Sequence, residues 1–194
     1  MGEIMSQDPG HTEWNREQLR GDDASRFEIR FARLSRTSVH WLIPSEWFAP
    51  ASSECREMFR DGHFYGCISV AQAVGEALAT KFLMDHHPAA ESQPGDTCAE
   101  KLFRAGVITD GCRLAFLRIR GDDRNDFHHL NKEVPTEGVK LEQRAEECVR
   151  DLYEIESEIF GYDISLPGEV TPRRLEYWPK VGANMMQVFM RKSY

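Results

Sequence analysis

The chain has 194 residues, enough for one domain with a substantial hydrophobic core but too few for two domains of ordinary size. Hydrophobic residues make up 41% and charged residues 29%, which is typical of a globular protein and excludes collagen-like and wholly disordered classes. The formal net charge of -8 disfavours a protein that coats nucleic acid through a broad basic surface, because such binding relies on many phosphate contacts.

The amino terminus and the hydropathy pattern predict a cytoplasmic protein. Residues 1–23 are acidic and polar, whereas a signal peptide begins basic and continues apolar. No segment reaches the roughly 20 uninterrupted apolar residues of a membrane span, so we expect no membrane partner. The five cysteines are widely spaced and include no C-x-x-C pair, which argues against a disulfide framework and a zinc ribbon. We therefore expect neither a metal site nor a cofactor.

The predicted fold class is all-α, an antiparallel bundle of four to five helices with irregular or weakly β extensions at both ends. Residues 1–49 form the N-terminal extension, a polar arm followed by FEIRFARL and by a proline-broken aromatic connector. Apolar residues alternate in FEIRFARL, and this short pattern fits either a strand or a helix. Residues 50–162 form the helical bundle. Residues 163–194, which carry prolines inside an aromatic and basic run, form the C-terminal extension.

Two long helices dominate the predicted bundle. Residues 63–86 and 139–160 each keep an apolar face at helical spacing for at least five turns. A shorter helix is expected after Pro50, with Ser52 or Ser53 as its cap and Gly62 as its stop. Further short helices are expected within TCAEKLFRAG and from about Asp110 into the stretch RIRGDDRNDFHH.

The stretch RNDFHH, residues 124–129, concentrates side chains suited to phosphodiester chemistry. Histidine exchanges protons near neutral pH, and arginine neutralises a phosphate without losing its own charge. In RNA the 2′-hydroxyl can attack the adjacent phosphate, so cleavage needs a base, an acid and a cation but no metal. This chemistry makes the stretch the candidate active site, through Arg124, Asn125, His128 and His129.

The same stretch resembles the R-N-x-x-x-H signature of HEPN domains (higher eukaryotes and prokaryotes nucleotide-binding), an all-helical family rich in metal-independent RNases and toxins. The form with asparagine directly after arginine occurs once in the chain. Glu76, in AVGEALATKFL, resembles the glutamate that HEPN proteins carry on a long alanine-containing helix before the motif. Residues 139–160 resemble the last helix of the family's bundle, so the resemblance covers residues 50–162.

This resemblance implies a metal-independent endoribonuclease, acting as a toxin or defence RNase. Arg124 would bind the phosphate and stabilise its charge, and His129 would transfer a proton. Asn125 would orient the phosphate or the histidine, and His128 is a second candidate for proton transfer. The neighbouring residues expected to bind RNA are Arg118, Arg120 and Lys132, and those expected to support the site are Glu76 and Asp126.

One chain supplies too few catalytic groups for the whole reaction. If the segment is helical, Asn125 and His129 share one face, while Arg124 lies nearer to His128. HEPN RNases, which this chain resembles, share a dimeric arrangement in which two motifs face each other across a twofold axis. The resemblance therefore implies a homodimer with one composite site and RNA as the substrate.

Two other functions stay open. One is a non-catalytic HEPN-like module that binds a nucleotide or a protein partner, such as a nucleotidyltransferase antitoxin, and the acidic charge favours it. The other is an α-helical interaction or assembly protein with an accidental motif. In that case Arg124, Asn125 and His129 belong to a capped helix start.

Overall fold

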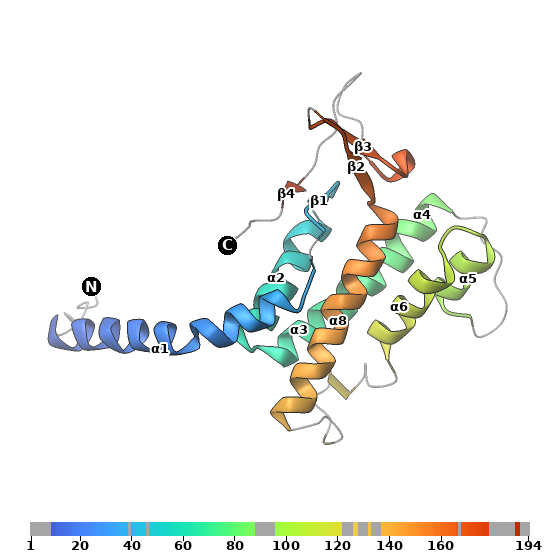
Figure 1. Ribbon diagram of the computed structural model, residues 1–194. Coiled ribbons are helices and arrows are strands. Elements are labelled where there is room, and N and C mark those ends of the chain that lie inside the picture. The colour runs from blue at the N-terminus through green and yellow to red at the C-terminus, as the bar shows by residue number, and fades with distance from the viewer. Residues whose placement is uncertain are drawn as a thin grey trace, which may run out of the picture. The chain divides into compact units, whose positions relative to one another are not determined.

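The computed structural model describes residues 9–38, 40–45, 47–87, 96–121, 126–127, 132, 137–166, 168–178 and 189–190. The chain divides into two compact units, Met1–Arg36 and Thr37–Tyr194. The first unit contains helix α1, and the second contains all the other described elements (Figure 1).

Helix α1 (Pro9–Ser35) corrects the expectation of an irregular or weakly β N-terminal extension. Phe27 and Phe31, whose alternating pattern fits either a strand or a helix, lie one helical turn apart and stack with ring centroids separated by 6.3 Å. Glu13 and Arg16, three positions apart and so on the same face of a helix, form an ion pair of 3.2 Å. Arginine, glutamate, leucine and alanine recur along the segment, and these residues favour helices. Helix propensity and neighbouring-turn contacts thus outweigh the alternating pattern.

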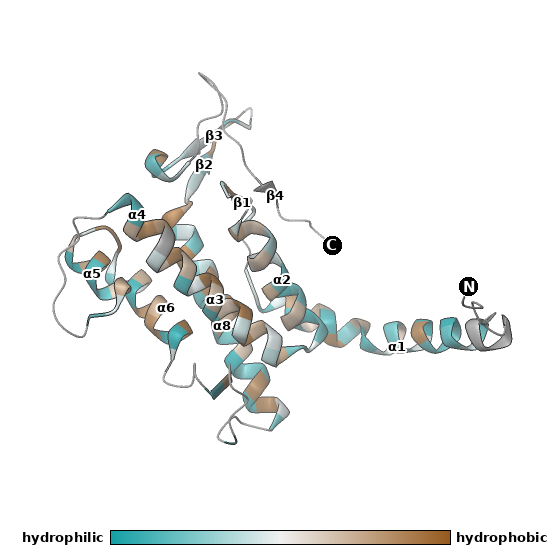
Figure 2. Cartoon of the chain, turned by 180° about the vertical axis from the view of Figure 1, so that it is seen from behind, coloured by the Kyte–Doolittle hydropathy of each residue, from teal (hydrophilic) through white to brown (hydrophobic). Residues whose placement is uncertain are grey.

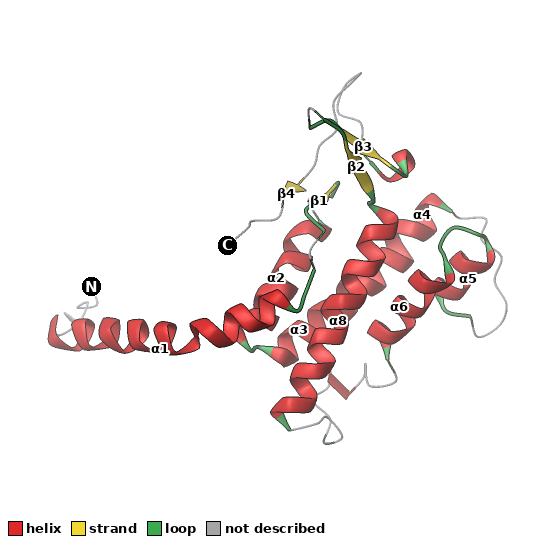
Figure 3. Cartoon of the chain, viewed as in Figure 1, coloured by secondary structure: helices red, strands yellow, loops and turns green. Residues whose placement is uncertain are grey.

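The second unit is mostly helical, which confirms the all-α class (Figure 3). Helix α3 contacts α2, α6 and α8, and α8 also contacts α2 and α6, so these four helices enclose the core. The helices are α2 (Phe48–Asp61), α3 (Phe64–Ala77), α4 (Met84–His86), α5 (Cys98–Arg104), α6 (Asp110–Arg120) and α8 (Gly138–Ile159).

Both predicted long helices are present. Helix α3 continues through a π-helical turn (Leu78–Leu83) into α4, which gives one helical segment from Phe64 to His86. Helix α8 covers nearly the whole of the second predicted segment. Their apolar faces meet the rest of the bundle, and the residues that become fully buried include Cys67, Ile68, Ala71, Leu78, Ala145, Cys148, Ile155 and Ile159.

The start of α2 differs from the prediction, although Gly62 ends the helix as expected, with a φ of 85°. Ser52 and Ser53 do not cap the helix, because α2 already begins at Phe48. The Ser45 hydroxyl instead accepts hydrogen bonds from the backbone N–H groups of Trp47 and Phe48, at 3.2 and 3.3 Å. Ser52 is buried and donates its hydroxyl hydrogen to the buried carboxylate of Glu156, so it links α2 to α8.

The segment after α8 is weakly β, as expected. Two short antiparallel pairs are described, in which Ile164 lies opposite Val170 and Ile43 lies opposite Phe189. The first pair joins β2 (Tyr162–Ile164) to β3 (Val170–Pro172), and the second joins β1 (Leu42–Ile43) to β4 (Phe189–Met190).

Aromatic side chains attach the C-terminal segment to the bundle. Phe82, in the π-helical turn, has its ring centroid 5.5 Å from that of Phe160 and 5.6 Å from that of Tyr177. Tyr177 and Trp178 are both 2% exposed. The C-terminal segment therefore shares one hydrophobic core with the helices.

Among the described residues, one helix is long and apolar enough to cross a membrane, the segment Phe64–His86. However, 53% of its apolar window is buried inside the protein, and a core helix passes the same test of length and composition. Figure 2 shows hydrophobic residues along α3 where it runs beside α8. Packing within the bundle accounts for this apolarity, and a cytoplasmic location remains a prediction.

Candidate functional site

Most of the RNDFHH motif lies outside the described residues. These undescribed positions are Arg124, Asn125, His128 and His129. Their predicted catalytic roles therefore stay predictions. Asp126 is described as helical and half-buried, and Lys132 lies exposed in a turn.

Phe127, in the middle of the motif, is part of the hydrophobic core. It is helical and 3% exposed. Its ring centroid lies 6.1 Å from that of Tyr65, in the first turn of α3. A buried phenylalanine inside the motif thus ties this stretch of chain to the long central helix.

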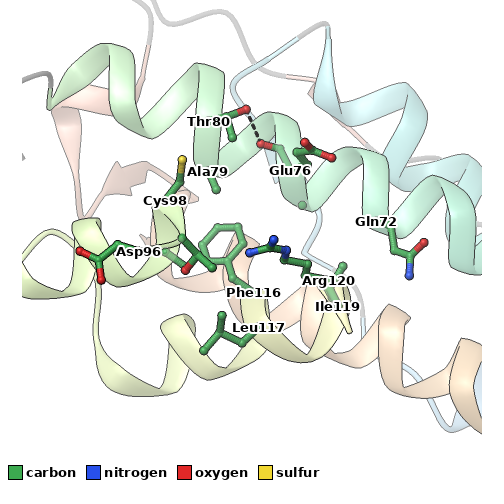
Figure 4. A pocket seen from close by; sticks show the side chains of 13 residues that line it. Gln72, Glu76, Ala79, Thr80, Asp96, Cys98, Phe116, Leu117, Ile119 and Arg120 are labelled. Carbon is green, nitrogen blue, oxygen red and sulfur yellow. Dashed lines mark hydrogen bonds between the residues drawn. The ribbon is translucent and has the colours of Figure 1, made fainter. Parts of the chain in front are cut away.

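A cavity of about 280 Å³ lies between α3, α5 and α6 (Figure 4). This volume is near the lower end of the range of roughly 300 to 1,000 Å³ that small-molecule sites occupy. Its apolar lining includes Ala79, Phe116 and Ile119, and its polar lining includes Gln72, Glu76, Thr80, Asp96 and Arg120. The combination of an apolar floor and a few polar groups is typical of a small-ligand site.

The cavity brings together two of the residues predicted to serve the site. Glu76 comes from α3 and Arg120 from the last position of α6, and both line the cavity. In Figure 4 the Arg120 side chain lies beside the ring of Phe116, on the side that faces α3. The structure therefore places a carboxylate and a guanidinium, 44 positions apart in the sequence, on one small hollow.

Gln72, one turn before Glu76 on α3, is a polar residue of the cavity that sequence reasoning missed. It is 2% exposed, and neither its Oε1 nor its Nε2 has a hydrogen-bond partner among the described residues. An unsatisfied buried amide costs about 1–3 kcal/mol. The sequence signal is faint: Gln72 is a single polar residue within an otherwise apolar stripe.

The backbone of the long helix is irregular beside this cavity. The Thr80 hydroxyl donates a hydrogen bond of 2.7 Å to the carbonyl of Glu76, drawn dashed in Figure 4, and both residues flank the start of the π-helical turn. Such back-bonding hydroxyls bend helices, and π-helical turns occur often at functional sites. Gly75 allows a close approach here, because a Cβ on it would lie 3.2 Å from Cγ2 of Ile119.

The polar groups on the α5 side of the cavity are already engaged. Thr97 and Glu100 form a capping box, in which the carboxylate accepts from the Thr97 N–H at 2.7 Å and Thr97 Oγ1 accepts from the Glu100 N–H at 3.2 Å. The hydrogen bond from the Thr97 backbone is the largest cause of a lowered pKa for the Glu100 carboxyl. Asp96 forms an ion pair with Arg104.

Arg118, predicted to bind RNA, makes ion pairs within the chain. Its Nη2 lies 2.6 Å from Oδ1 of Asp151 and 3.2 Å from Oε2 of Glu154, so it joins α6 to α8. The hydrogen bond from Asp151 is the largest cause of a raised pKa for the Arg118 guanidinium. Burial raises the pKa of the Asp151 carboxyl, although Arg118 opposes this rise. RNA would have to compete with both carboxylates for Arg118.

We expect Arg118→Ala to lower the free energy of unfolding by about 1–3 kcal/mol at neutral pH, because it leaves the Asp151 carboxylate buried and unpaired. The pKa of Asp151 is raised in the folded protein, so the folded state takes up this proton more readily than the unfolded chain. The penalty is therefore present above the folded pKa and disappears as the pH falls through it. Urea unfolding of mutant and wild type between neutral and mildly acidic pH measures the difference.

The matched control is Arg113→Ala on the same helix. Arg113 pairs with Asp110, whose side chain is 57% exposed, at 2.6 Å. Because water already solvates that carboxylate, Arg113→Ala should lower the free energy of unfolding by less than about 1 kcal/mol. An Arg118→Ala penalty that stays constant as the pH falls would contradict the buried-charge explanation.

Within the described part of the chain, no group of three or more histidine, cysteine, aspartate or glutamate residues is placed to hold a metal ion. The neighbouring His86 and His87 both have other partners. His87 Nε2 lies 2.6 Å from the hydroxyl of Tyr177, and His86 Nδ1 lies 2.8 Å from the carbonyl of Phe82. The contact of His87 with Tyr177 ties the end of the helical segment to the C-terminal segment.

No protein-family model matches the chain, and no curated protein or solved structure is significantly similar to it. The likeness to HEPN domains therefore rests on the R-N-x-x-x-H motif and the predicted order of the helices.

Proposed function

We propose that this chain is a metal-independent endoribonuclease of the HEPN type, acting as a toxin or defence RNase in the cytoplasm. One observation carries the proposal: the R-N-x-x-x-H motif begins four residues after Arg120, which lines a cavity together with Glu76. Phe127, inside the motif, is buried in the same bundle. A chain spans at most about 3.5 Å per residue, so these two attachments limit the distance of the motif from the cavity.

In the proposed reaction the 2′-hydroxyl of the RNA attacks the adjacent phosphorus and its proton passes to a histidine. The bond from phosphorus to the 5′-oxygen breaks, and the leaving oxygen takes a proton. His129 transfers protons, with His128 as the second candidate, and Arg124 stabilises the charge on the phosphate. Asn125 orients the phosphate or the histidine, and Glu76 holds the motif arginine.

The proposed assembly is a homodimer, because one motif supplies a single arginine and two adjacent histidines. Two motifs facing each other across a twofold axis would supply a base, an acid and two cations to one phosphate. Light scattering of the intact protein should then give the mass of two chains.

A non-catalytic HEPN-like module is the second candidate. The net charge of -8 and the ion pairs of Arg118 with Asp151 and Glu154 both favour it, because they leave less free positive charge for RNA. Such a module would bind a nucleotide or a nucleotidyltransferase partner in a toxin–antitoxin pair.

Incubation of the purified protein with mixed RNA in excess chelator separates the two functions. The nuclease should cut RNA and leave 2′,3′-cyclic phosphate and 5′-hydroxyl ends. DNA should stay intact because it lacks the attacking hydroxyl. Cleavage of DNA, or cleavage of RNA only with added magnesium, would refute the proposed mechanism. Intact RNA under all conditions would favour the binding module.

A further inference from the structure

We propose that the last three turns of helix α1 bind a single-stranded segment of RNA, through one row of arginines and a neighbouring row of apolar side chains. The inference rests on the proposed function in one respect, since the strand would belong to the RNA that the motif cleaves. Strand binding can be measured on DNA, which the proposed reaction does not cut, so the two proposals can fail separately.

The two rows follow from a repeated pair of residues near the end of α1. An arginine is followed directly by a large apolar residue at positions 26, 30 and 33. Positions spaced i, i+4 and i+7 lie on one face of a helix, so each member of the pair forms its own row along the axis. The arginine row consists of Arg26, Arg30 and Arg33, and the apolar row consists of Phe27, Phe31 and Leu34.

The apolar row presents two aromatic rings to solvent. Phe27 is 61% exposed and Phe31 is 60% exposed. Their planes differ by only 11°, so the two rings offer flat faces in the same orientation. Successive unpaired bases stack on exposed aromatic rings of this kind, and such stacking holds single strands with little dependence on sequence. The rings are therefore suited to neighbouring bases of one strand.

The arginine row supplies positive charge beside these rings. Residues 26–34 contain three arginines and one acidic residue, a net charge of +2 within a chain of net charge -8. Arg26 is exposed. Arg30 pairs with Asp23 at 2.8 Å, but the Asp23 side chain is 71% exposed, so this pair adds little stability and a phosphate can replace it. Arginine binds phosphate through two hydrogen bonds, which suits the backbone of a strand whose bases lie on the rings.

The arrangement fits a nucleic acid strand better than a membrane surface or a second copy of α1. Ile29 lies two positions from each phenylalanine, on the other side of the helix, so the apolar residues do not form the single face that an interfacial helix needs. The apolar row also ends early. Arg20 and Glu17 occupy its earlier positions, so the row is too short for the three to four heptads typical of a coiled coil.

The test is the fluorescence anisotropy of a labelled, mixed-sequence single-stranded DNA titrated with the intact protein in chelator. Binding should be saturable and should weaken between about 50 and 200 mM salt, because phosphate contacts are salt-dependent. Phe31→Ala should weaken binding roughly fivefold or more, since it removes a ring on which a base stacks. Arg26→Gln should reduce the slope of log K against log salt by about 0.7, the value for one phosphate contact on a single strand. Both side chains are exposed, and alanine and glutamine favour helices, so α1 should form in each variant.

Ile29→Ala is the matched control, because Ile29 is 52% exposed on the same helix but lies away from both rows. It should bind DNA as the wild type does. Absence of DNA binding, binding that does not depend on salt, or equal weakening by Ile29→Ala and Phe31→Ala would overturn the inference. Binding of anionic lipid vesicles without binding of DNA would assign the two rows to a membrane surface instead.

The outcome for RNA cleavage separates this inference from the proposed function. RNA cleavage by a protein that does not bind the single strand would overturn this inference alone. Strand binding that depends on Phe31, without any cleavage of RNA, would support the two rows and refute the nuclease.

Discussion

His129→Ala is expected to slow RNA cleavage by roughly 10²- to 10⁴-fold, the usual contribution of a general acid or base. The attacking 2′-hydroxyl has to lose its proton, and the variant has no group at this position to accept it. Single-turnover cleavage of a short RNA in chelator, followed by the appearance of cyclic-phosphate ends, measures the rate. The circular dichroism spectrum should stay helical, because the bundle keeps its apolar contacts.

His63→Ala provides the matched control for this loss. His63 precedes the first turn of α3, and its side chain makes no capping hydrogen bond. Its removal should leave cleavage within about twofold of the wild type, as expected for a histidine that takes no part in the reaction. Full activity of His129→Ala would exclude the proposed proton transfer, and the binding module would become the better proposal.

The long helices were predictable because the apolar residues of each one repeat at helical spacing over many residues. Five turns of apolar spacing define a face that has to be buried, and both faces are indeed buried. Helix α1 was not predictable in this way. Three of its apolar residues, Phe27, Ile29 and Phe31, follow a period of two, whereas the stacked pair Phe27 and Phe31 also satisfies a helix. Short windows of this kind do not distinguish the two periods.

The candidate site was predictable only in part, because burial and pairing depend on distant segments. Glu76 and Arg120 were found through the motif and its neighbouring helix, and they line one cavity. Gln72 was missed, because an unsatisfied amide is a property of the packed structure. Arg118 lies just before the motif like Arg120, yet it pairs with Asp151, 33 positions along the chain. No local pattern distinguishes these two arginines.

Phe127 is therefore the described residue that best tests the connection between the bundle and the motif. Phe127→Ala should lower the free energy of unfolding by about 3–5 kcal/mol, because it removes a buried ring and leaves a cavity beside Tyr65. Phe103→Ala is the matched control. Phe103 is 38% exposed, so its truncation should cost much less. Denaturant unfolding of both variants measures the difference.

Phe127→Ala is also expected to cleave RNA more slowly than its loss of stability alone would explain. Phe127 lies between Arg124 and His129, so its anchor should restrict both catalytic side chains, and misplacement of reacting groups by about 1 Å can cost roughly 10²-fold in rate. The assay should be run at a low temperature where unfolding curves show that the variant is folded. Phe127→Leu, which keeps an apolar side chain in the core, should recover most of both properties. A folded Phe127→Ala protein that cleaves RNA at the wild-type rate would show that the motif acts independently of this anchor.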